Sequence, residues 1–112
     1  AREIREKSPG LTMVYDLVLT SKEKIMPVGC VAISGNKVFG YAPSDKVDLD
    51  YAAKFVRQML SQNEFRKVDV RLVHQYGDFL AKMEGMNKAA EGKEGQKEHE
   101  RQIANVIMNI SL

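Results

Sequence analysis

Apolar and polar residues alternate along the first third of the chain, which is typical of β-strands. The run from Leu11 to Thr20 places an apolar residue at every second position and mixed residues between them. Two further runs, Val28 to Ser34 and Lys37 to Tyr41, are joined by Gly35-Asn36, and a Gly-Asn pair favours a tight hairpin turn. We therefore predict three strands, the first with one apolar face made of Leu11, Met13, Tyr15, Leu17 and Leu19.

The apolar period then changes from two residues to about 3.6, which predicts an amphipathic helix from Leu49 to Leu60. Asp48 precedes this helix as an N-cap, and Asp50 places negative charge in its first turn, where the helix dipole favours it. The apolar positions of the predicted helix are Ala52, Phe55, Val56, Met59 and Leu60.

Alternation returns after this helix. Val68, Val70 and Leu72 alternate with charged residues and predict a fourth strand. The run from Phe79 to Met83 alternates in the same manner, and Gly77 supplies a turn residue between the two runs. We therefore expect a second hairpin here and no helix.

The last third of the chain begins with a polar stretch, residues 84–96, which contains three glycines and nearly balanced charges. That composition predicts a mobile polar loop. Residues 97–112 follow as a terminal helix with an apolar stripe. At the other end, we expect residues 1–10 to form a frayed N-terminus, because Ser8-Pro9-Gly10 stops any short helix before it.

These elements predict a single α+β domain over residues 1–112. We expect an antiparallel sheet of about five strands in the order β-β-β-α-β-β-α, with two main helices packed on one face. A chain of 112 residues is long enough to bury one core without disulfides or metals. The stripe of the last helix leaves two alternatives open: it covers the chain's own sheet, or it docks on a partner or a second copy.

Composition narrows the class of protein. The chain carries 17 basic and 15 acidic residues, and this balance argues against a dedicated nucleic-acid binder. One cysteine cannot form an internal disulfide. The longest apolar runs fall far short of the roughly 18 residues that cross a bilayer, and no signal peptide opens the chain. We expect a cytoplasmic protein with no membrane span.

The residues capable of chemistry do not form a recognisable constellation. Cys30 lies in the middle of an apolar strand, which predicts a buried structural thiol. His74 and His99 lack neighbours at metal-ligand spacing, so we expect no metal and no cofactor. A small enzyme that uses His74 with Asp78 or a tyrosine hydroxyl ranks last. Capping explains two members of the acidic cluster Asp45, Asp48 and Asp50.

A nucleic-acid-binding module is the second hypothesis. Basic residues would line one edge of the sheet, and two exposed tyrosines would stack on bases. Acidic residues are interleaved with them, as on an ordinary solvated surface. The residues of this hypothesis are Lys22, Lys24, Lys37, Arg66, Lys67, Arg71, Tyr41 and Tyr76.

The strand-turn-strand segment from Val28 to Tyr41, followed by the helix over residues 49–60, resembles the small α+β interaction domains of the roadblock and longin type. Three strands before the central helix depart from the usual roadblock order. The resemblance implies a non-catalytic adaptor that dimerises with a sheet continuous across two subunits.

The leading hypothesis is a non-catalytic protein–protein interaction or scaffold module that self-associates, with no catalytic residue. No cluster of titratable groups is visible, and the apolar strands and helix stripes exceed what a small monomer covers. The expected contacts to a protein partner or a second copy are Ile103, Val106, Ile107, Ile110 and Leu112.

Overall fold

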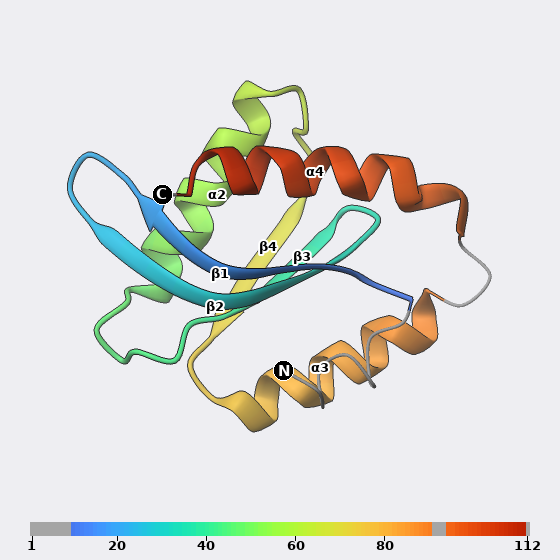
Figure 1. The fold of residues 1–112 in the computed structure, drawn as a ribbon, viewed down its shortest axis with the longest axis horizontal. Helices are drawn as coiled ribbons and strands as arrows, with labels where there is room; N and C mark the ends of the chain where they lie inside the picture. Colours follow the sequence, from blue (N-terminus) through green and yellow to red (C-terminus); the bar gives the residue numbers. More distant parts are fainter. Residues whose placement is uncertain (1–9, 91–93, 112) are drawn as a thin grey trace.

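The computed structural model describes residues 10–90 and 94–111 of the chain (Figure 1). It confirms an α+β fold. The expected frayed end lies almost wholly outside the described residues, as does Leu112. The elements are β1 (Thr12–Thr20), β2 (Ile25–Ser34), β3 (Lys37–Tyr41), α2 (Leu49–Gln62), β4 (Asp69–Val73), α3 (Tyr76–Ala89), a 3-10 turn (Glu94–Gln96) and α4 (Lys97–Asn109).

The sheet has four strands in the spatial order β1-β2-β3-β4. The first three strands form an antiparallel meander. The predicted turn at Gly35 joins β2 and β3, and Gly35 has a positive φ of 56° there. β4 pairs in parallel with β3, so the expectation of a wholly antiparallel sheet of about five strands is corrected. The parallel pairing follows from the α2 crossover, which returns the chain to the end of the sheet from which β3 started.

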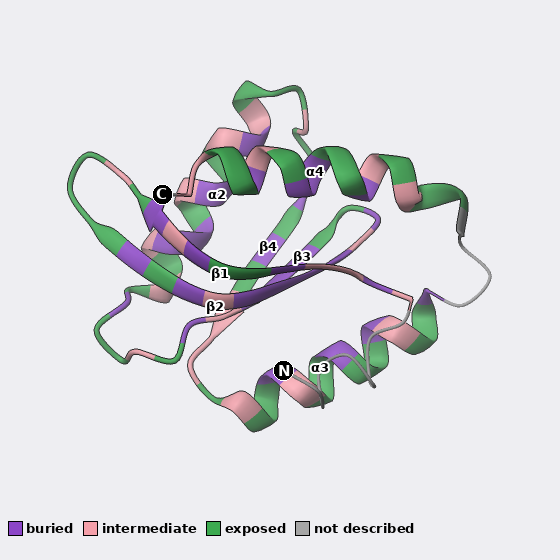
Figure 2. Cartoon of the chain, in the orientation of Figure 1, coloured by how far each residue is buried: buried purple, intermediate pink, exposed green. Residues whose placement is uncertain are grey.

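The sheet is covered on both faces (Figures 1 and 2). The helices α2 and α4 lie on one face, as predicted for the two main helices, and α3 lies on the other. The core under α2 and α4 includes Ile33, Leu60, Ile103 and Ile107, all fully buried. The second core, under α3, is built from Leu11, Cys30, Ala32, Phe39, Phe79, Met83, Met86 and Ala90.

The first strand of the predicted second hairpin is present as β4, but α3 replaces its second strand and the first half of the predicted loop over residues 84–96. Phe79, Met83 and Met86 recur at helical spacing and are buried, whereas Ala81 is exposed. The ring of Phe79 stacks on Phe39 of β3, with the centroids 5.6 Å apart. Burial of three large side chains contributes several kcal/mol, because each fully buried one contributes roughly 1.5–3 kcal/mol. This outweighs the cost of about 1 kcal/mol for each helical glycine.

The strands β1 and β2 change face part-way along their length, which the regular alternation did not predict. Before Asp16, the even-numbered Val14 faces α4; after it, the odd-numbered Leu17 does. Asp16 has a φ of 55°, outside the strand region. On β2 the same switch occurs at the opposing Gly29, so the register of the pair is unchanged. The expectation of one continuous apolar face from Leu11 to Leu19 is therefore wrong.

The central helix α2 begins as predicted. The side chain of Asp48 accepts a hydrogen bond from the backbone N–H of Tyr51 at 3.1 Å, which satisfies one of the free donors of the first turn. None of the helices in the described part of the chain is long and apolar enough to cross a membrane.

Candidate functional site

The apolar stripe of α4, predicted as a partner contact, packs on the chain's own sheet. Ile103 and Ile107 are fully buried, and Val106 and Ile110 are partly buried against the same core. Leu112 lies outside the described residues. Of the two alternatives that the sequence left open, the structure therefore shows the stripe covering its own sheet.

A different candidate surface is the edge of the sheet formed by β1. β1 and β4 are the two edge strands. Near the end of β1, Leu19 bridges Ser111, and the backbone N–H of Val18 donates to the Ser111 hydroxyl at 2.8 Å. Residues 12–17 of β1 pair with β2, and β1 is the last strand on its side of the sheet within the described ranges. Such an edge is a template for a further strand.

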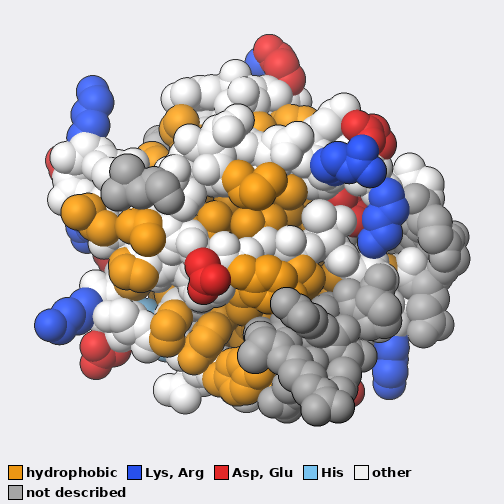
Figure 3. All heavy atoms as spheres, viewed as in Figure 1, with side chains coloured by type: hydrophobic (Ala, Val, Ile, Leu, Met, Phe, Trp, Pro, Cys, Tyr) orange, Lys and Arg blue, Asp and Glu red, His pale blue; other side chains and the backbone are white. Residues whose placement is uncertain are grey.

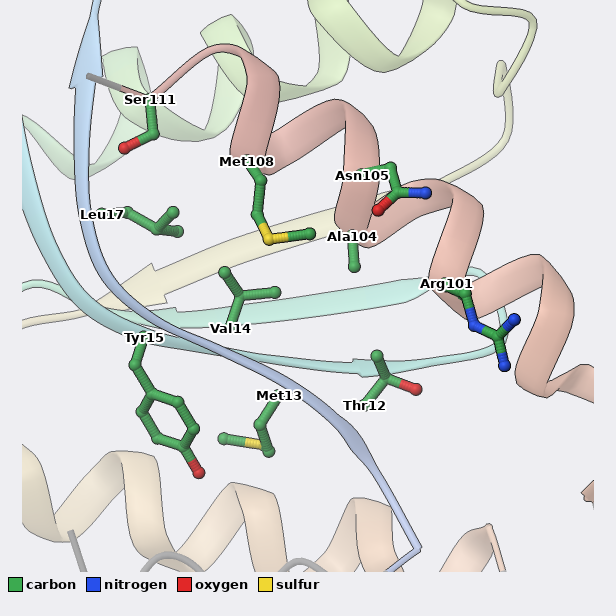
Figure 4. Close-up of a pocket in the computed structure, with 10 residues that line it drawn as sticks. All are labelled: Thr12, Met13, Val14, Tyr15, Leu17, Arg101, Ala104, Asn105, Met108 and Ser111. Atoms are coloured by element: carbon green, nitrogen blue, oxygen red, sulfur yellow. The ribbon is translucent and has the colours of Figure 1, made fainter.

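An open groove of about 580 Å³ runs between this part of β1 and α4. In Figure 4, Val14 and Leu17 point from β1 toward α4, and Met108 points down from the helix to meet them. Met13 and Tyr15 leave the same strand toward α3. The groove thus has an apolar floor beside an edge strand of the described sheet. Its lining residues are Thr12, Met13, Val14, Tyr15, Leu17, Arg101, Ala104, Asn105, Met108 and Ser111.

Exposed apolar side chains concentrate at this groove. Among the described residues, the exposed large hydrophobic side chains are Tyr15 (37% exposed), Met108 (46%) and Ile25 (67%), and the first two line the groove. Figure 3 shows hydrophobic atoms gathered across the middle of this face. Contiguous apolar surface of this kind marks interaction sites on soluble proteins.

A buried carboxylate holds α4 in place above the edge. Glu100 is only 2% exposed. It accepts hydrogen bonds from the Thr12 hydroxyl at 2.7 Å and from the backbone N–H of Gly35 at 2.8 Å, and Lys97 Nζ lies 3.6 Å away. Burial of a carboxylate is tolerated because these partners replace water. Sequence reasoning missed Glu100, although its position three residues before Ile103 places it on the buried face of α4.

The opposite edge strand, β4, is short and charged. Arg57 of α2 donates a hydrogen bond to the backbone carbonyl of Val70 on β4 at 3.2 Å. Asp69 and Arg71 place a pair of charges, 3.5 Å apart, on the same five-residue strand. Short, charged edge strands resist edge-to-edge association. The two edges of one sheet are therefore chemically different.

Cys30, His74 and His99, which the sequence singled out, are buried or contact other groups of the chain. Cys30 is 2% exposed, as predicted, and burial raises the pKa of its thiol to about 11. The His74 ring lies 2.9 Å from the Ala42 carbonyl, and Nδ1–H donates to it. His99 Nε2 lies 2.6 Å from the side-chain oxygen of Asn36. No group of three metal-ligating side chains occurs within the described residues.

The basic residues of the nucleic-acid hypothesis do not converge on one edge. Lys22 and Lys24 lie in the loop before β2, whereas Lys37 follows its far end, and a ten-residue strand spans about 30 Å. Arg66 and Lys67 lie before β4, at the Lys37 end, because β3 and β4 are parallel.

Several of these side chains also have partners already. Lys24 lies 3.8 Å from Asp48, Arg66 pairs with Glu64 at 2.6 Å and Arg71 pairs with Asp69. The rings of Tyr41 and Tyr76 pack on each other with their centroids 5.5 Å apart. The six basic residues are thus separated along the sheet, and three of them, Lys24, Arg66 and Arg71, lie within 4 Å of a carboxylate.

No protein-family model, curated protein or solved structure matches this chain. The resemblance to roadblock and longin domains therefore rests on the strand-turn-strand layout alone, and the function has to be inferred from the open edge and its groove.

Proposed function

We propose that this chain is a non-catalytic protein–protein interaction module that self-associates through residues 12–17 of β1 and the groove under α4. The observation that carries the proposal is an edge strand of the described sheet beside an apolar groove, with Met108 and Tyr15 among the exposed large hydrophobic residues along it. The interface differs from the predicted one, because Ile103 and Ile107 are occupied in the core.

The physical basis is strand addition. A strand that joins β1 lies about 4.8 Å from it and satisfies its outward backbone N–H and C=O groups. Side chains of that strand would cover Val14, Leu17 and Met108, and burial of such apolar surface contributes about 25 cal/mol per Å². A second copy offers the same β1 edge. A symmetric dimer therefore pairs the β1 strand of one copy with the β1 strand of the other.

Sedimentation equilibrium over a range of protein concentrations tests the proposal. We expect a reversible dimer in the wild type and at least tenfold weaker dimerisation in Met108→Asp, because a carboxylate would lose water against the apolar floor. Ile25→Asp is the matched control: Ile25 is also an exposed hydrophobic residue but does not line the groove, so this variant should dimerise like the wild type.

Two results would contradict the proposal. One is a wild-type chain that remains monomeric at every concentration, and the other is equal weakening by both aspartate substitutions.

A further inference from the structure

The chain is attached to β1 at both ends of the groove, but by contacts of different kinds (Figure 4). At the Thr12 end, Glu100 of α4 accepts a hydrogen bond from a side chain of the strand. At the Leu17 end, the backbone N–H of Val18 donates to the Ser111 hydroxyl at 2.8 Å. We infer that Ser111 is an autoinhibitory latch, which occupies the Leu17 end of the groove until a second copy displaces it. This inference rests on the proposed function and concerns the regulation of the same site.

The backbone of Val18 points away from β2, toward the side of the sheet on which a second copy would dock. Val18 opposes Pro27 of β2, and a proline has no N–H to donate. Opposing residues of an antiparallel pair either exchange both hydrogen bonds or exchange none, so Val18 directs its N–H and C=O outward. Ser111 therefore occupies a donor that would otherwise face the docking segment of a second copy.

The latch already resembles the start of an added strand. Leu19 and Ser111 form an isolated antiparallel bridge, which is the shortest form of the pairing that a further strand would extend. Asp16, with a φ of 55°, separates this end of β1 from residues 12–15. The latch therefore controls the Leu17 end of the groove, and its action requires no continuous ladder across Asp16.

The two attachments differ in strength, so we expect α4 to open at the Ser111 end. Glu100 is buried and charged, and hydrogen bonds to charged groups are roughly twice as strong as those between neutral groups. Ser111 is neutral and only partly buried. Ile107 is fully buried, whereas the residues that follow it through Ser111 are exposed or partly buried. A helix end of this kind frays before the rest of the helix does.

Release of the latch changes the groove in two ways. It frees the Val18 N–H, and it lets Met108, which lies in the same last turn, move away from Leu17. A symmetric dimer opens one latch in each copy. Because only molecules with an open latch bind, the apparent dissociation constant is divided by the open fraction once for each copy. A modest change at the latch therefore has a squared effect on dimerisation.

Removal of the hydroxyl tests the latch. In Ser111→Ala the Val18 N–H loses this acceptor, so the open fraction rises. We expect sedimentation equilibrium to show dimerisation about tenfold tighter than in the wild type, which corresponds to roughly a threefold change in each copy. Ser111→Thr keeps a hydroxyl and should dimerise like the wild type. Asn109→Ala alters an exposed residue of the same turn and should also leave dimerisation unchanged.

Amide hydrogen exchange at low protein concentration reports on the latch in the monomer. The Val18 amide should exchange slowly in the wild type and in Ser111→Thr, and at least several-fold faster in Ser111→Ala. Equal protection of this amide in all three, or a Ser111→Ala dimer no tighter than the wild-type dimer, would overturn the latch and leave the proposed function standing. A wild type that stays monomeric at every concentration would overturn the proposed function itself.

Discussion

Each edge of the sheet is flanked by a helix with a charged side chain that points toward the edge strand. The two side chains bind different groups. Arg57 of α2 bonds the backbone of β4 itself, at the Val70 carbonyl. Glu100 of α4 bonds the Thr12 side chain and the Gly35 N–H of the neighbouring turn, so it anchors the helix and leaves the β1 backbone open. At β4 the helix side chain therefore contacts the strand backbone, whereas at β1 it contacts a strand side chain and the neighbouring turn.

The difference also extends to the side chains along each edge. β4 has five residues and carries Asp69 and Arg71, whereas residues 12–15 of β1 are uncharged. Natural sheets avoid association by shortening and charging their edges. The absence of these devices along residues 12–15, beside a groove with an apolar floor, is what distinguishes a docking edge from an ordinary one.

The largest effect is expected where the open edge is anchored. Glu100→Ala removes two hydrogen bonds to a carboxylate and leaves the buried Gly35 N–H without its partner. Hydrogen bonds to charged groups contribute roughly 1.5–3 kcal/mol each, so we expect the free energy of unfolding to fall by about 3 kcal/mol. Urea unfolding measures this loss. Glu98→Ala, on the exposed side of the same helix, should change stability by less than about 0.5 kcal/mol.

The next largest effect is the pH dependence of stability that Cys30 causes. Cys30 lies on β2, opposite Tyr15 of the edge strand β1. Burial raises the thiol pKa from 9.0 to about 11, so the folded state holds this proton more tightly than the unfolded state does. The stabilisation is complete below pH 9 and is lost as the pH rises toward 11, by about 2 kcal/mol. Subtracting the pH profile of Cys30→Ala isolates this contribution. Identical profiles would indicate that the open edge frays and admits water.

Substitutions at the β4 edge should lower stability less than those above and should also change the oligomeric state. Arg57→Leu combined with Asp69→Thr and Arg71→Thr removes the charges that protect β4. We expect a loss of about 1 kcal/mol from the hydrogen bond, together with growth beyond the dimer, because both edges of each copy can then pair. Light scattering detects the larger species. Lys54→Leu, which alters an exposed residue of α2, should leave the mass unchanged.

The sequence predicted those elements whose signals are local. The helix α2 followed from its apolar period and its Asp48 cap, and the turn at Gly35 followed from the dipeptide. The helix α3 was missed because Phe79 and Met83 fit both a period of two and a period of four. Only contact with Phe39, on another strand, decides between them.

The candidate site depended on information that no local pattern carries. The stripe containing Ile103 was correctly identified as apolar, but its partner is the chain's own sheet. Recognition of the open edge requires the strand order, which pairing across the whole chain determines. The change of face at Asp16 arises from one backbone angle, which hydrophobic periodicity does not encode.

Amide hydrogen exchange at low and high protein concentration tests the central difference between the edges most directly. Exchange at an outward-facing N–H slows when a further strand accepts its hydrogen bond. We predict that amides within residues 12–17 of β1 become more protected as concentration rises, while those of residues 69–73 in β4 do not change. Concentration-dependent protection in β4, or none in β1, would contradict the assignment of β1 as the docking edge.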